Sequence, residues 1–358
     1  MAEVAVVQEV LPHYRVAFFD RLDRRLAGVG VRLRVLHSVV TPEVSRQVEG
    51  SAWAERVPVR HVATPAGSLV WQQVRQRTRA ADLVVVEHAN RMLANYPLLL
   101  RAARGRQRLA FWGHGANLQT AHARSAAERF KARTARAPHW WFAYTEGSAA
   151  RVRATGFPAS RICVVDNSTD TDAYPAEPGK RPTTCVFVGT LHRYKRVEVL
   201  LDAGEALSRR VPGFHLDVVG DGPLRPLVEE RASWSPWLEC HGPLTGPAKV
   251  DVVARASLML MPGLVGLAVI DSFAARSPLV TTDYPHHSPE IEYLDDGVNG
   301  VVVPGEGSPD QFAAAVEELL LDPDRVARLR EGCVVSHARY SLDHMVERFA
   351  GGIEAALS

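Results

Sequence analysis

Short apolar runs of strand length recur along the first half of the chain, separated by segments of mixed polarity. The runs are Glu3–Glu9, Val31–Leu36, Asp82–Glu87, Arg108–Trp112 and Trp140–Thr145. Phe18–Leu26 has apolar residues at helical spacing, and the longer segments between later runs have helical composition. Strands that alternate with helices in this way predict a parallel sheet with crossover helices.

A second set of apolar runs follows Pro175–Pro182, a stretch of proline and charged residues that predicts an interdomain linker. These runs are Thr184–Val188, Leu216–Val219, Leu238–His241, Leu258–Met261 and Leu279–Thr282, with a predicted helix at Val197–Arg209. The chain ends in an amphipathic helix, Ser341–Leu357, with no strand after it. At 358 residues the chain is long enough for two domains. We expect them at residues 1–170 and 171–340, with residues 341–358 as a separate helix.

The segment Met259–Ser272, MLMPGLVGLAVIDS, leads from a buried strand through a Pro/Gly loop into a helix. In open α/β sheets the ligand crevice lies beyond the carboxyl ends of the strands, and the amides of a helix start bind anions. The predicted ligand of this loop is therefore a phosphate. Asp271 would repel a phosphate but would accept hydrogen bonds from a ribose, which suggests a nucleoside diphosphate. A loop that only joins a strand to a helix, with Asp271 on a solvated face, explains the pattern equally well.

Polar residues also follow the predicted strands of the first half. They are His13 and Arg15, then Glu87 and Asn90, then His114 in the sequence FWGHGAN. Because the carboxyl ends of parallel strands meet at one edge of a sheet, these residues mark a candidate functional edge. A structural role is the simpler interpretation for each residue alone. His114 has the stronger functional signal, since Gly113 and Gly115 permit a close approach of the backbone.

Four ordered motifs resemble the family 4 glycosyltransferases. CVFVGTLHRYKR resembles the family's strand–Gly–Arg–Leu–Lys signature, and VVGDGP resembles its VGxGP turn. PGLVGLAVIDSFAARSPLVTT resembles the E-x7-E segment, and GVNGVVVP resembles the DGxNGxLVP that follows it. The resemblance implies an α/β fold of GT-B architecture, in which two Rossmann-like domains face each other across a cleft. It also implies an N-terminal acceptor domain, a C-terminal donor domain and a last helix that returns to the N-terminal domain.

The chain departs from the family pattern at three positions. Gly263 stands where the family has the first glutamate, Asp271 where it has the second, and Thr190 where an arginine follows Gly189. Lys195 is retained. The loss of the first glutamate concerns the contacts with the donor sugar, and Arg193 is a candidate replacement for the missing guanidinium.

The resemblance implies a retaining transferase, of the hexosyltransferase class, that moves a sugar from a nucleoside-diphosphate sugar to an acceptor hydroxyl. It implies that Lys195 and His114 are catalytic, that Lys195 and the amides of Leu264–Leu267 bind the diphosphate, and that Asp271 holds the ribose. The full set of expected donor-binding residues is Gly189, Thr190, Arg193, Gly242, Pro243, Leu244, Gly263, Leu264, Val265, Gly266, Leu267 and Asp271. The expected acceptor-side residues are His13, Arg15, Glu87 and Asn90. No DxD-type pair is placed for Mg²⁺, so we expect neither a metal nor another cofactor.

Two other functions fit the same motifs. The substitutions at Gly263 and Asp271 favour an inactive protein that binds nucleotide sugars. A sugar-nucleotide epimerase shares the fold, but we would expect more acid/base carboxylates in it.

Composition adds information on location and partners. The four cysteines, Cys163, Cys185, Cys240 and Cys333, are widely spaced, which predicts neither disulfides nor a zinc site. No signal peptide or membrane-spanning run is evident, so we expect a cytoplasmic protein, peripheral at most at the inner face of the membrane. No feature predicts a nucleic-acid partner.

The charge is divided unevenly along the chain. Residues 1–170 hold 25 Lys and Arg against 13 Asp and Glu, whereas residues 171–358 hold 17 against 27. Part of the positive charge lies at Arg124–Arg136, just before the aromatic run Trp140–Phe142, and part at four arginines, Arg101, Arg104, Arg106 and Arg108. Such a region fits an anionic acceptor, either a small molecule or lipid-linked, and a membrane-surface contact. A solvated helix followed by buried tryptophans is the simpler alternative.

Overall fold

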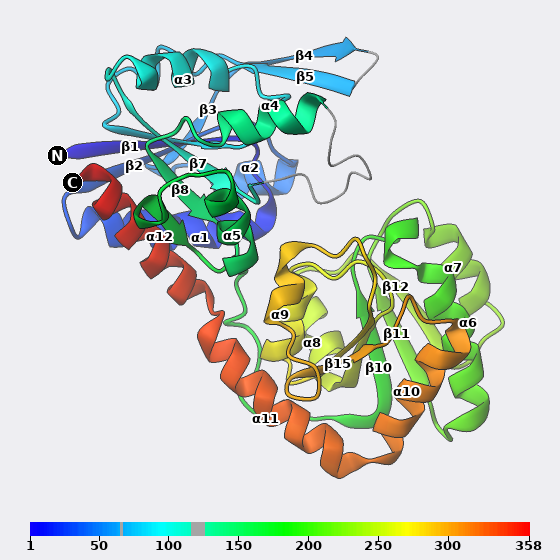
Figure 1. The fold of residues 1–358 in the computed structure, drawn as a ribbon. Helices are drawn as coiled ribbons and strands as arrows, with labels where there is room; N and C mark the ends of the chain where they lie inside the picture. Colours follow the sequence, from blue (N-terminus) through cyan, green and yellow to red (C-terminus); the bar gives the residue numbers. More distant parts are fainter. Residues whose placement is uncertain (65–66, 116–125) are drawn as a thin grey trace. The chain divides into compact units, whose positions relative to one another are not determined.

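The computed structural model describes residues 1–64, 67–115 and 126–358 of the chain. These residues form two compact units, Met1–Asp170 together with Leu342–Ser358, and Thr171–Ser341 (Figure 1). The chain therefore passes between the units twice, after Asp170 and after Ser341. The stretch Pro175–Pro182 lies inside the second unit, so its prediction as an interdomain linker is wrong. The reason is local bonding, because Lys180 donates to the carbonyl oxygen of Ala256 and to the hydroxyl of Ser277, both at 2.8 Å.

The first unit is built on a seven-stranded parallel sheet with the order β3-β2-β1-β6-β7-β8-β9. Its strands are β1 (Ala2–Val10), β2 (Val31–Val39), β3 (Ala54–Arg56), β6 (Leu83–Glu87), β7 (Arg108–Gly113), β8 (Trp140–Ala143) and β9 (Ile162–Val164). The helices are η1 (His13–Arg15), α1 (Val16–Ala27), α2 (Pro42–Gln47), α3 (Asn95–Ala103), α4 (Ala126–Thr134), α5 (Glu146–Ala154), η2 (Ala159–Arg161) and α12 (Leu342–Leu357). Every apolar run predicted as a strand in this half is a strand.

Alternation along each strand divides the core of the first unit into two layers. Val4 and Val6 of β1 pack on the side of α1 and α12, whereas Ala5 and Val7 pack on the side of α3 and α5. Both faces of the sheet are therefore covered, as parallel sheets require.

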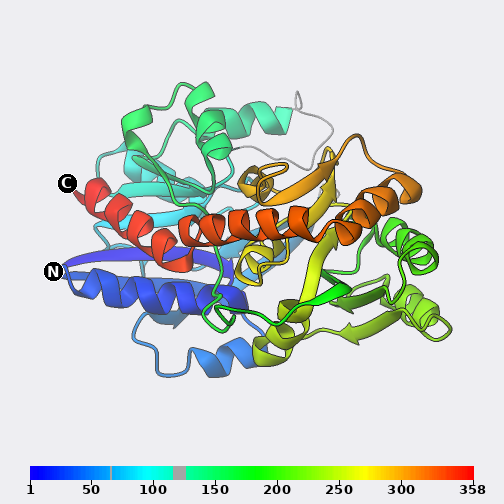
Figure 2. The same cartoon turned by 90° about the horizontal axis from the view of Figure 1, so that it is seen from below.

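The last helix, α12, completes the first layer. It runs beside α1 (Figure 2), and its Phe349 ring stacks on Phe142 of β8 at a centroid distance of 4.3 Å. Arg21 of α1 forms ion pairs with Asp343 of α12 at 2.7 Å and with Asp170 at 3.0 Å. The C-terminal helix thus returns to the N-terminal unit, as the resemblance implies.

An antiparallel hairpin between β3 and β6 was not predicted. It consists of β4 (Val59–Thr64) and β5 (Gly67–Gln72), in a region for which no strand was predicted. Most hairpin side chains are exposed, and only Val70 and Gln72 are fully buried. The sequence therefore lacks the apolar alternation by which a half-buried strand is recognised.

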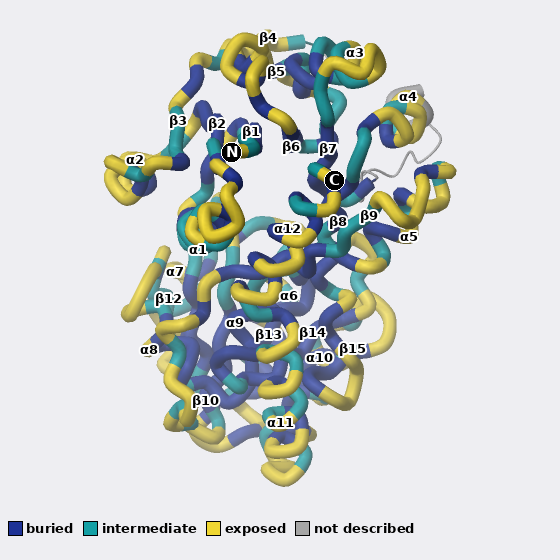
Figure 3. Tube along the Cα trace, turned by 90° about the vertical axis from the view of Figure 1, so that its left-hand side faces the viewer, coloured by how far each residue is buried: buried dark blue, intermediate teal, exposed yellow. Residues whose placement is uncertain are grey.

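The second unit has a six-stranded parallel sheet with the order β12-β11-β10-β13-β14-β15. The strands are β10 (Arg181–Val188), β11 (His215–Val219), β12 (Leu238–Gly242), β13 (Ala256–Met261), β14 (Leu279–Thr282) and β15 (Gly300–Val303). The helices are η3 (Arg193–Lys195), α6 (Val197–Arg210), α7 (Arg225–Ala232), α8 (Gly246–Arg255), α9 (Ala268–Ala274), η4 (Pro289–Tyr293), α10 (Pro309–Leu321) and α11 (Pro323–Arg339). The neighbouring interior strands β13 and β14 are buried along their whole length (Figure 3). Their near-continuous apolar sequences are typical of strands that are covered on both faces.

Candidate functional site

The two predicted phosphate-binding segments of the second unit lie in contact. Lys195 ends η3, just after β10, and its Nζ donates a hydrogen bond of 2.7 Å to the carbonyl oxygen of Leu264. The backbone N–H of Leu264 in turn donates to the carbonyl oxygen of Tyr194 at 2.8 Å. The structure thus brings Lys195 together with the loop between β13 and α9.

Gly263 lies against the backbone of η3 and leaves no space for a side chain. A Cβ atom at this position would lie 2.4 Å from the carbonyl oxygen of Tyr194 and 2.5 Å from the carbonyl carbon of Lys195. Because the neighbours are backbone atoms, no rotamer change relieves the clash. The loop therefore closes directly on η3 at the position where the family has its first glutamate.

Two of the four loop amides predicted to bind phosphate donate hydrogen bonds within the protein instead. The prediction is therefore wrong for these two amides. The N–H of Leu264 is bonded to Tyr194, and the N–H of Val265 donates to Nδ1 of His287 at 2.9 Å. Within the described parts of the chain, the N–H groups of Gly266 and Leu267 have no acceptor. The following helix, α9, has only seven residues. Its dipole is therefore short, and the ammonium of Lys195 adds a positive charge at the same loop.

The segment that holds this loop was not identified from the sequence. His287 accepts from Val265 at Nδ1, and its Nε2 donates to the carbonyl oxygen of Thr282 at 2.9 Å, which assigns the neutral Nε2–H tautomer. Burial lowers the pKa of His287, in agreement with a neutral ring. The N–H of Ser288 donates to the carbonyl oxygen of Val265 at 3.0 Å. The polar sequence DYPHHSPE, directly after β14, was the available signal.

The charge of Lys195 is sensitive to its surroundings. Burial lowers its pKa to about 8, and the negative charge of Glu290 in η4 opposes this shift. Glu290 is itself buried. At neutral pH Lys195 therefore remains largely protonated, and its protonated form is favoured further when an anion binds beside it.

Asp271 is not on a solvated face, so that alternative is wrong. The residue is 5% exposed, and its Oδ1 lies 2.7 Å from Nζ of Lys249 in α8. The hydroxyl of Tyr174 donates to the same oxygen at 3.0 Å. Neither partner was predictable from local sequence, because they lie 22 and 97 residues away along the chain.

The other expected donor-binding residues lie around the carboxyl edge of the same sheet. Gly189 follows β10, and its N–H donates to the carbonyl oxygen of Val219 at 3.0 Å. Thr190 and Pro243 are exposed, Leu244 is partly buried, and Gly242 ends β12. The exposed guanidinium of Arg193 donates to the hydroxyl of Tyr194 at 3.2 Å.

Arg196, which follows η3, connects this turn to the segment Glu306–Gly307 through its side chain. Its backbone conformation is strained. It has φ of 54° and ψ of 48°, the left-handed region that non-glycine residues seldom adopt. Its guanidinium donates to the carbonyl oxygens of Glu306 and Gly307, the latter at 3.0 Å. These bonds stabilise the turn that presents Lys195.

In the first unit, His114 lies at the carboxyl end of β7. Its ring packs against Tyr144 at a centroid distance of 4.5 Å, and its buried Nδ1 has no hydrogen-bond partner within the described part of the chain. Burial, assisted by the positive charges of Lys131 and Arg151, lowers the pKa of His114 to about 4. Gly115 has φ of +74°, and a Cβ there would lie 2.8 Å from Cγ2 of Val152. His114 is therefore a neutral imidazole with free hydrogen-bonding capacity.

Glu87, at the end of β6, shares an electrostatic environment with His114. Burial raises the pKa of the Glu87 carboxyl, and the negative charge of Glu9 raises it further. The positive charges of Arg91 and Lys131 act in the opposite direction and lower this pKa. Lys131 thus influences both Glu87 and His114. Asn90 contributes its backbone carbonyl to a hydrogen bond from the Tyr96 hydroxyl at 2.9 Å.

Arg15, predicted on the acceptor side, is instead part of the core. It is 3% exposed, and its guanidinium lies 4.8 Å from the centroid of Trp112. It also donates to Oδ1 of Asn167 at 2.5 Å. A side chain this enclosed supports the packing of α1, so its assignment as an acceptor residue is wrong. The neighbouring His13 is exposed.

Comparison with known proteins reports a family match for the second unit. Residues 182–322 match the family described as glycosyl transferases group 1. Over these residues the chain is similar to the group 1 glycosyltransferases. The alpha-D-kanosaminyltransferase of Streptomyces kanamyceticus is 27% identical over 304 residues, which cover 81% of this chain and 75% of that protein. The D-inositol 3-phosphate glycosyltransferase of Nocardia farcinica (strain IFM 10152) is 30% identical over 235 residues, or 58% of this chain and 50% of that protein. The chain thus spans three quarters of the first relative and half of the second.

Solved structures show that this glycosyltransferase has the GT-B fold. Anabaena Alr3699/HepE in complex with UDP aligns with a TM-score of 0.74 at 16% identity, over 99% of this chain and 100% of that one. TarM of S. aureus aligns with a TM-score of 0.73 at 9% identity, over 100% and 99% of the two chains. At these identities the likeness concerns the fold alone.

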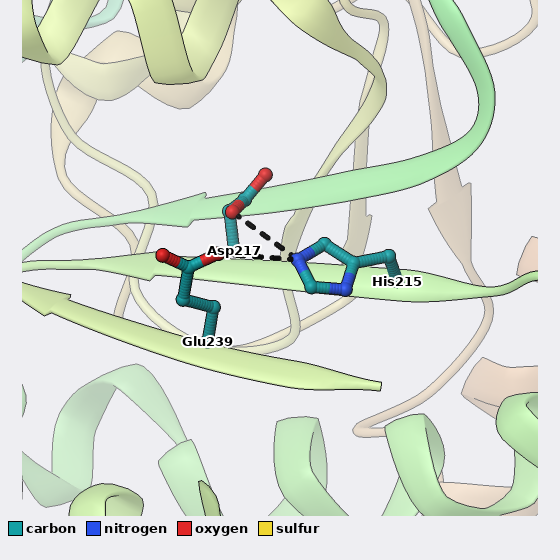
Figure 4. A group of neighbouring side chains, drawn as sticks. All are labelled: His215, Asp217 and Glu239. Carbon is teal, nitrogen blue, oxygen red and sulfur yellow. Dashed lines mark ion pairs between the residues drawn. The ribbon is translucent and has the colours of Figure 1, made fainter. Parts of the chain in front are cut away.

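One cluster of the glycosyltransferase has the composition of a metal site. His215, Asp217 and Glu239 place ligand atoms within 4.8 Å of one another on β11 and β12 (Figure 4). Arg255, however, donates to Oδ1 of Asp217 at 2.6 Å and to Oδ2 at 3.2 Å, and His241 lies 2.7 Å from Oδ1. Despite burial, these hydrogen bonds hold the pKa of Asp217 well below its usual range. A carboxylate already neutralised by a guanidinium is suited to an ion-pair network and not to a cation.

The basic region before β8 differs from its prediction. Residues 124 and 125 lie outside the described residues, and Lys131 acts on Glu87 and His114 as noted above. Trp141 and Phe142 are fully buried in β8, so the aromatic run does not form a surface. Arg101 and Arg108 donate to backbone carbonyl oxygens, while Arg104 and Arg106 are exposed. No helix in the described parts of the chain is long and apolar enough to span a membrane.

Proposed function

We propose that this glycosyltransferase moves a hexose from a nucleoside-diphosphate sugar to a hydroxyl group of an acceptor, with retention of the anomeric configuration. The observation that carries the proposal is the contact between Lys195 and the loop Gly263–Leu267 at the carboxyl edge of the second sheet. This contact joins two motifs within the residues that match the family.

Lys195 and two loop amides are the groups that stabilise the leaving diphosphate. Negative charge develops on the diphosphate as its bond to the anomeric carbon breaks. The ammonium of Lys195 and the N–H groups of Gly266 and Leu267 then gain in interaction energy, which lowers the barrier. In a front-face reaction the departing phosphate oxygen takes the proton of the acceptor hydroxyl, while the acceptor oxygen bonds to the anomeric carbon on the same face.

The proposed reaction does not require a metal ion. The cation of Lys195 supplies charge that a metal would otherwise provide at the diphosphate. The one metal-like cluster of the described residues is held by Arg255, as shown above. Activity in the presence of a chelator tests this part of the proposal.

The acceptor side of the reaction is assigned to the carboxyl edge of the first sheet. We propose that the neutral ring of His114 contacts the transferred sugar and that Glu87 accepts a hydrogen bond from an acceptor hydroxyl. The names of two relatives specify inositol 3-phosphate and phosphatidylinositol monomannoside. They support a polyol acceptor, either a small molecule or lipid-linked. Arg104 and Arg106 are among the exposed basic residues of this unit that a negatively charged membrane surface would attract.

The test is a transfer assay with UDP-, GDP-, ADP- and dTDP-sugars, with and without inositol 3-phosphate or phosphatidylinositol in vesicles. Nucleoside diphosphate release that rises with acceptor, and that EDTA does not reduce, supports the proposal. The anomeric coupling constant of the product, measured by proton NMR, should show the donor's configuration. Inversion contradicts the retaining mechanism, and binding without turnover under all these conditions contradicts the transferase.

A further inference from the structure

Two side chains from separate segments of the second unit contact the same carboxylate oxygen of Asp271. Lys249 on α8 places Nζ 2.7 Å from Oδ1 of Asp271 on α9. Tyr174, which precedes β10, donates its hydroxyl to the same oxygen at 3.0 Å. Burial and the charge of Asp271 raise the pKa of Tyr174, so its hydroxyl stays protonated and acts as a donor.

The two oxygens of the Asp271 carboxylate are therefore unequal. Oδ1 receives both donors, whereas Oδ2 has no hydrogen bond or ion pair within the described part of the chain. The Asp271 side chain is 7% exposed, and that of Lys249 is 24% exposed. A ligand that approaches this pair meets Lys249 together with Oδ2.

This inequality changes how a ribose can be bound. A carboxylate with two free oxygens accepts from both hydroxyls of a ribose, and a glutamate reaches one methylene further than an aspartate. Here only Oδ2 can accept, so the neighbouring hydroxyl needs a donor to its oxygen instead. The ammonium of Lys249 has three N–H groups, of which one is directed to Asp271.

The family resemblance implies that Asp271 holds the donor ribose. Building on the proposed function, we propose that Lys249 supplies the second contact to that ribose. One ribose hydroxyl donates to Oδ2 of Asp271, and Lys249 donates to the oxygen of the adjacent hydroxyl. Lys249 is thus a specificity-determining residue that replaces the second contact of a longer carboxylate. A 2′-deoxyribose leaves one of these two polar groups without its partner, which costs binding free energy.

The test compares a ribonucleotide with its 2′-deoxy analogue. The probe is whichever of UDP, GDP, ADP and CDP raises the melting temperature of the protein most. Calorimetric titration then gives Kd for that nucleotide and its 2′-deoxy form. We expect wild-type protein to bind the ribonucleotide at least 10-fold more tightly, and Lys249→Met to reduce this ratio to below threefold. Lys249→Arg, which keeps the charge, should retain most of the ratio.

Two further variants distinguish a loss of ribose recognition from a general loss of stability. Arg209→Ala removes an exposed cation of α6, which pairs with Glu205 at 2.7 Å, and should leave the ratio unchanged. The double variant Lys249→Met, Asp271→Glu gains a longer carboxylate with a free second oxygen, and should recover the ratio even if Lys249→Met is less stable. An unchanged ratio in Lys249→Met overturns the inference while the proposed function stands. Failure of all four nucleotides to bind overturns both.

Discussion

The ammonium nitrogen of Lys195 lies 2.7 Å from the backbone carbonyl oxygen of Leu264. Lys195, the predicted phosphate-binding cation, is thus hydrogen-bonded to the loop that is also predicted to bind phosphate. Its partner is a neutral carbonyl and not a carboxylate. A diphosphate that enters this site therefore displaces a single neutral hydrogen bond and gains a charge–charge interaction.

Restoration of the family's glutamate at position 263 should harm the protein. In Gly263→Glu the new Cβ would collide with the backbone of Tyr194 and Lys195, so the loop must move away from η3. We expect a lower melting temperature and at least 10-fold weaker binding of nucleoside diphosphate. Gly179→Ala is the control, because the space around Gly179 is open. Tighter binding in Gly263→Glu would contradict the close packing of this loop.

Nucleotide affinity should depend on pH through Lys195. The free protein has Lys195 with its pKa lowered to about 8, and a bound diphosphate favours the protonated form. Affinity is therefore highest well below pH 8, where Lys195 is protonated, and falls as the pH rises through 8, by at most tenfold per pH unit for one proton. Calorimetric titration between pH 7 and 10 measures this profile. A flat profile in wild-type protein, or an equal slope in Lys195→Met, would show that another group binds the phosphate.

His114 should affect turnover more than nucleotide affinity. His114→Ala removes a neutral hydrogen-bonding ring from the first unit, whereas the diphosphate site belongs to the second. We expect kcat to fall by about 100-fold, in the range seen for loss of one stabilising group, with Kd for nucleoside diphosphate within about twofold of wild type. Because its pKa is lowered to about 4, His114 should cause no loss of activity between pH 8 and 5. An equal loss of kcat and nucleotide affinity would indicate a purely structural role.

The last helix should contribute strongly to the stability of the first unit. Phe349 is fully buried in α12, stacked on Phe142 and in edge contact with Trp112 at 4.9 Å. Phe349→Ala should cost about 3–5 kcal/mol, the usual range for a buried phenylalanine. Differential scanning calorimetry should show a lower transition for the first unit, while Ala355→Ser on the exposed face of the same helix changes little. Unchanged melting of Phe349→Ala, or of a protein without residues 341–358, would contradict the packing of this helix.

Local patterns in the sequence were sufficient for most of the fold. Buried strands such as β6, β10 and β13 are continuous apolar runs, and their order along the chain predicts parallel sheets. The hairpin β4–β5 was missed because its side chains are mostly exposed and lack alternation. The motif around Lys195 and Gly263 also predicts where the donor side of the site lies.

Contacts between distant residues were not predictable in this way. No local pattern shows that Val265 gives its amide to His287, or that Asp271 shares an oxygen between Tyr174 and Lys249. Arg15 follows a strand as binding residues do, yet its surroundings of aromatic rings place it in the core. Residue type and position identified candidates, whereas their roles depended on partners that only the folded chain brings together.

The transfer rate of Lys195→Ala tests the central claim most directly. Nucleoside diphosphate release in the presence of acceptor is measured for wild-type protein, Lys195→Ala and the exposed control Arg209→Ala, with the folded state checked by melting temperature. If Lys195 stabilises the leaving diphosphate, Lys195→Ala loses about 100-fold or more in turnover, and Arg209→Ala retains the wild-type rate. A folded Lys195→Ala protein with wild-type turnover would contradict the claim.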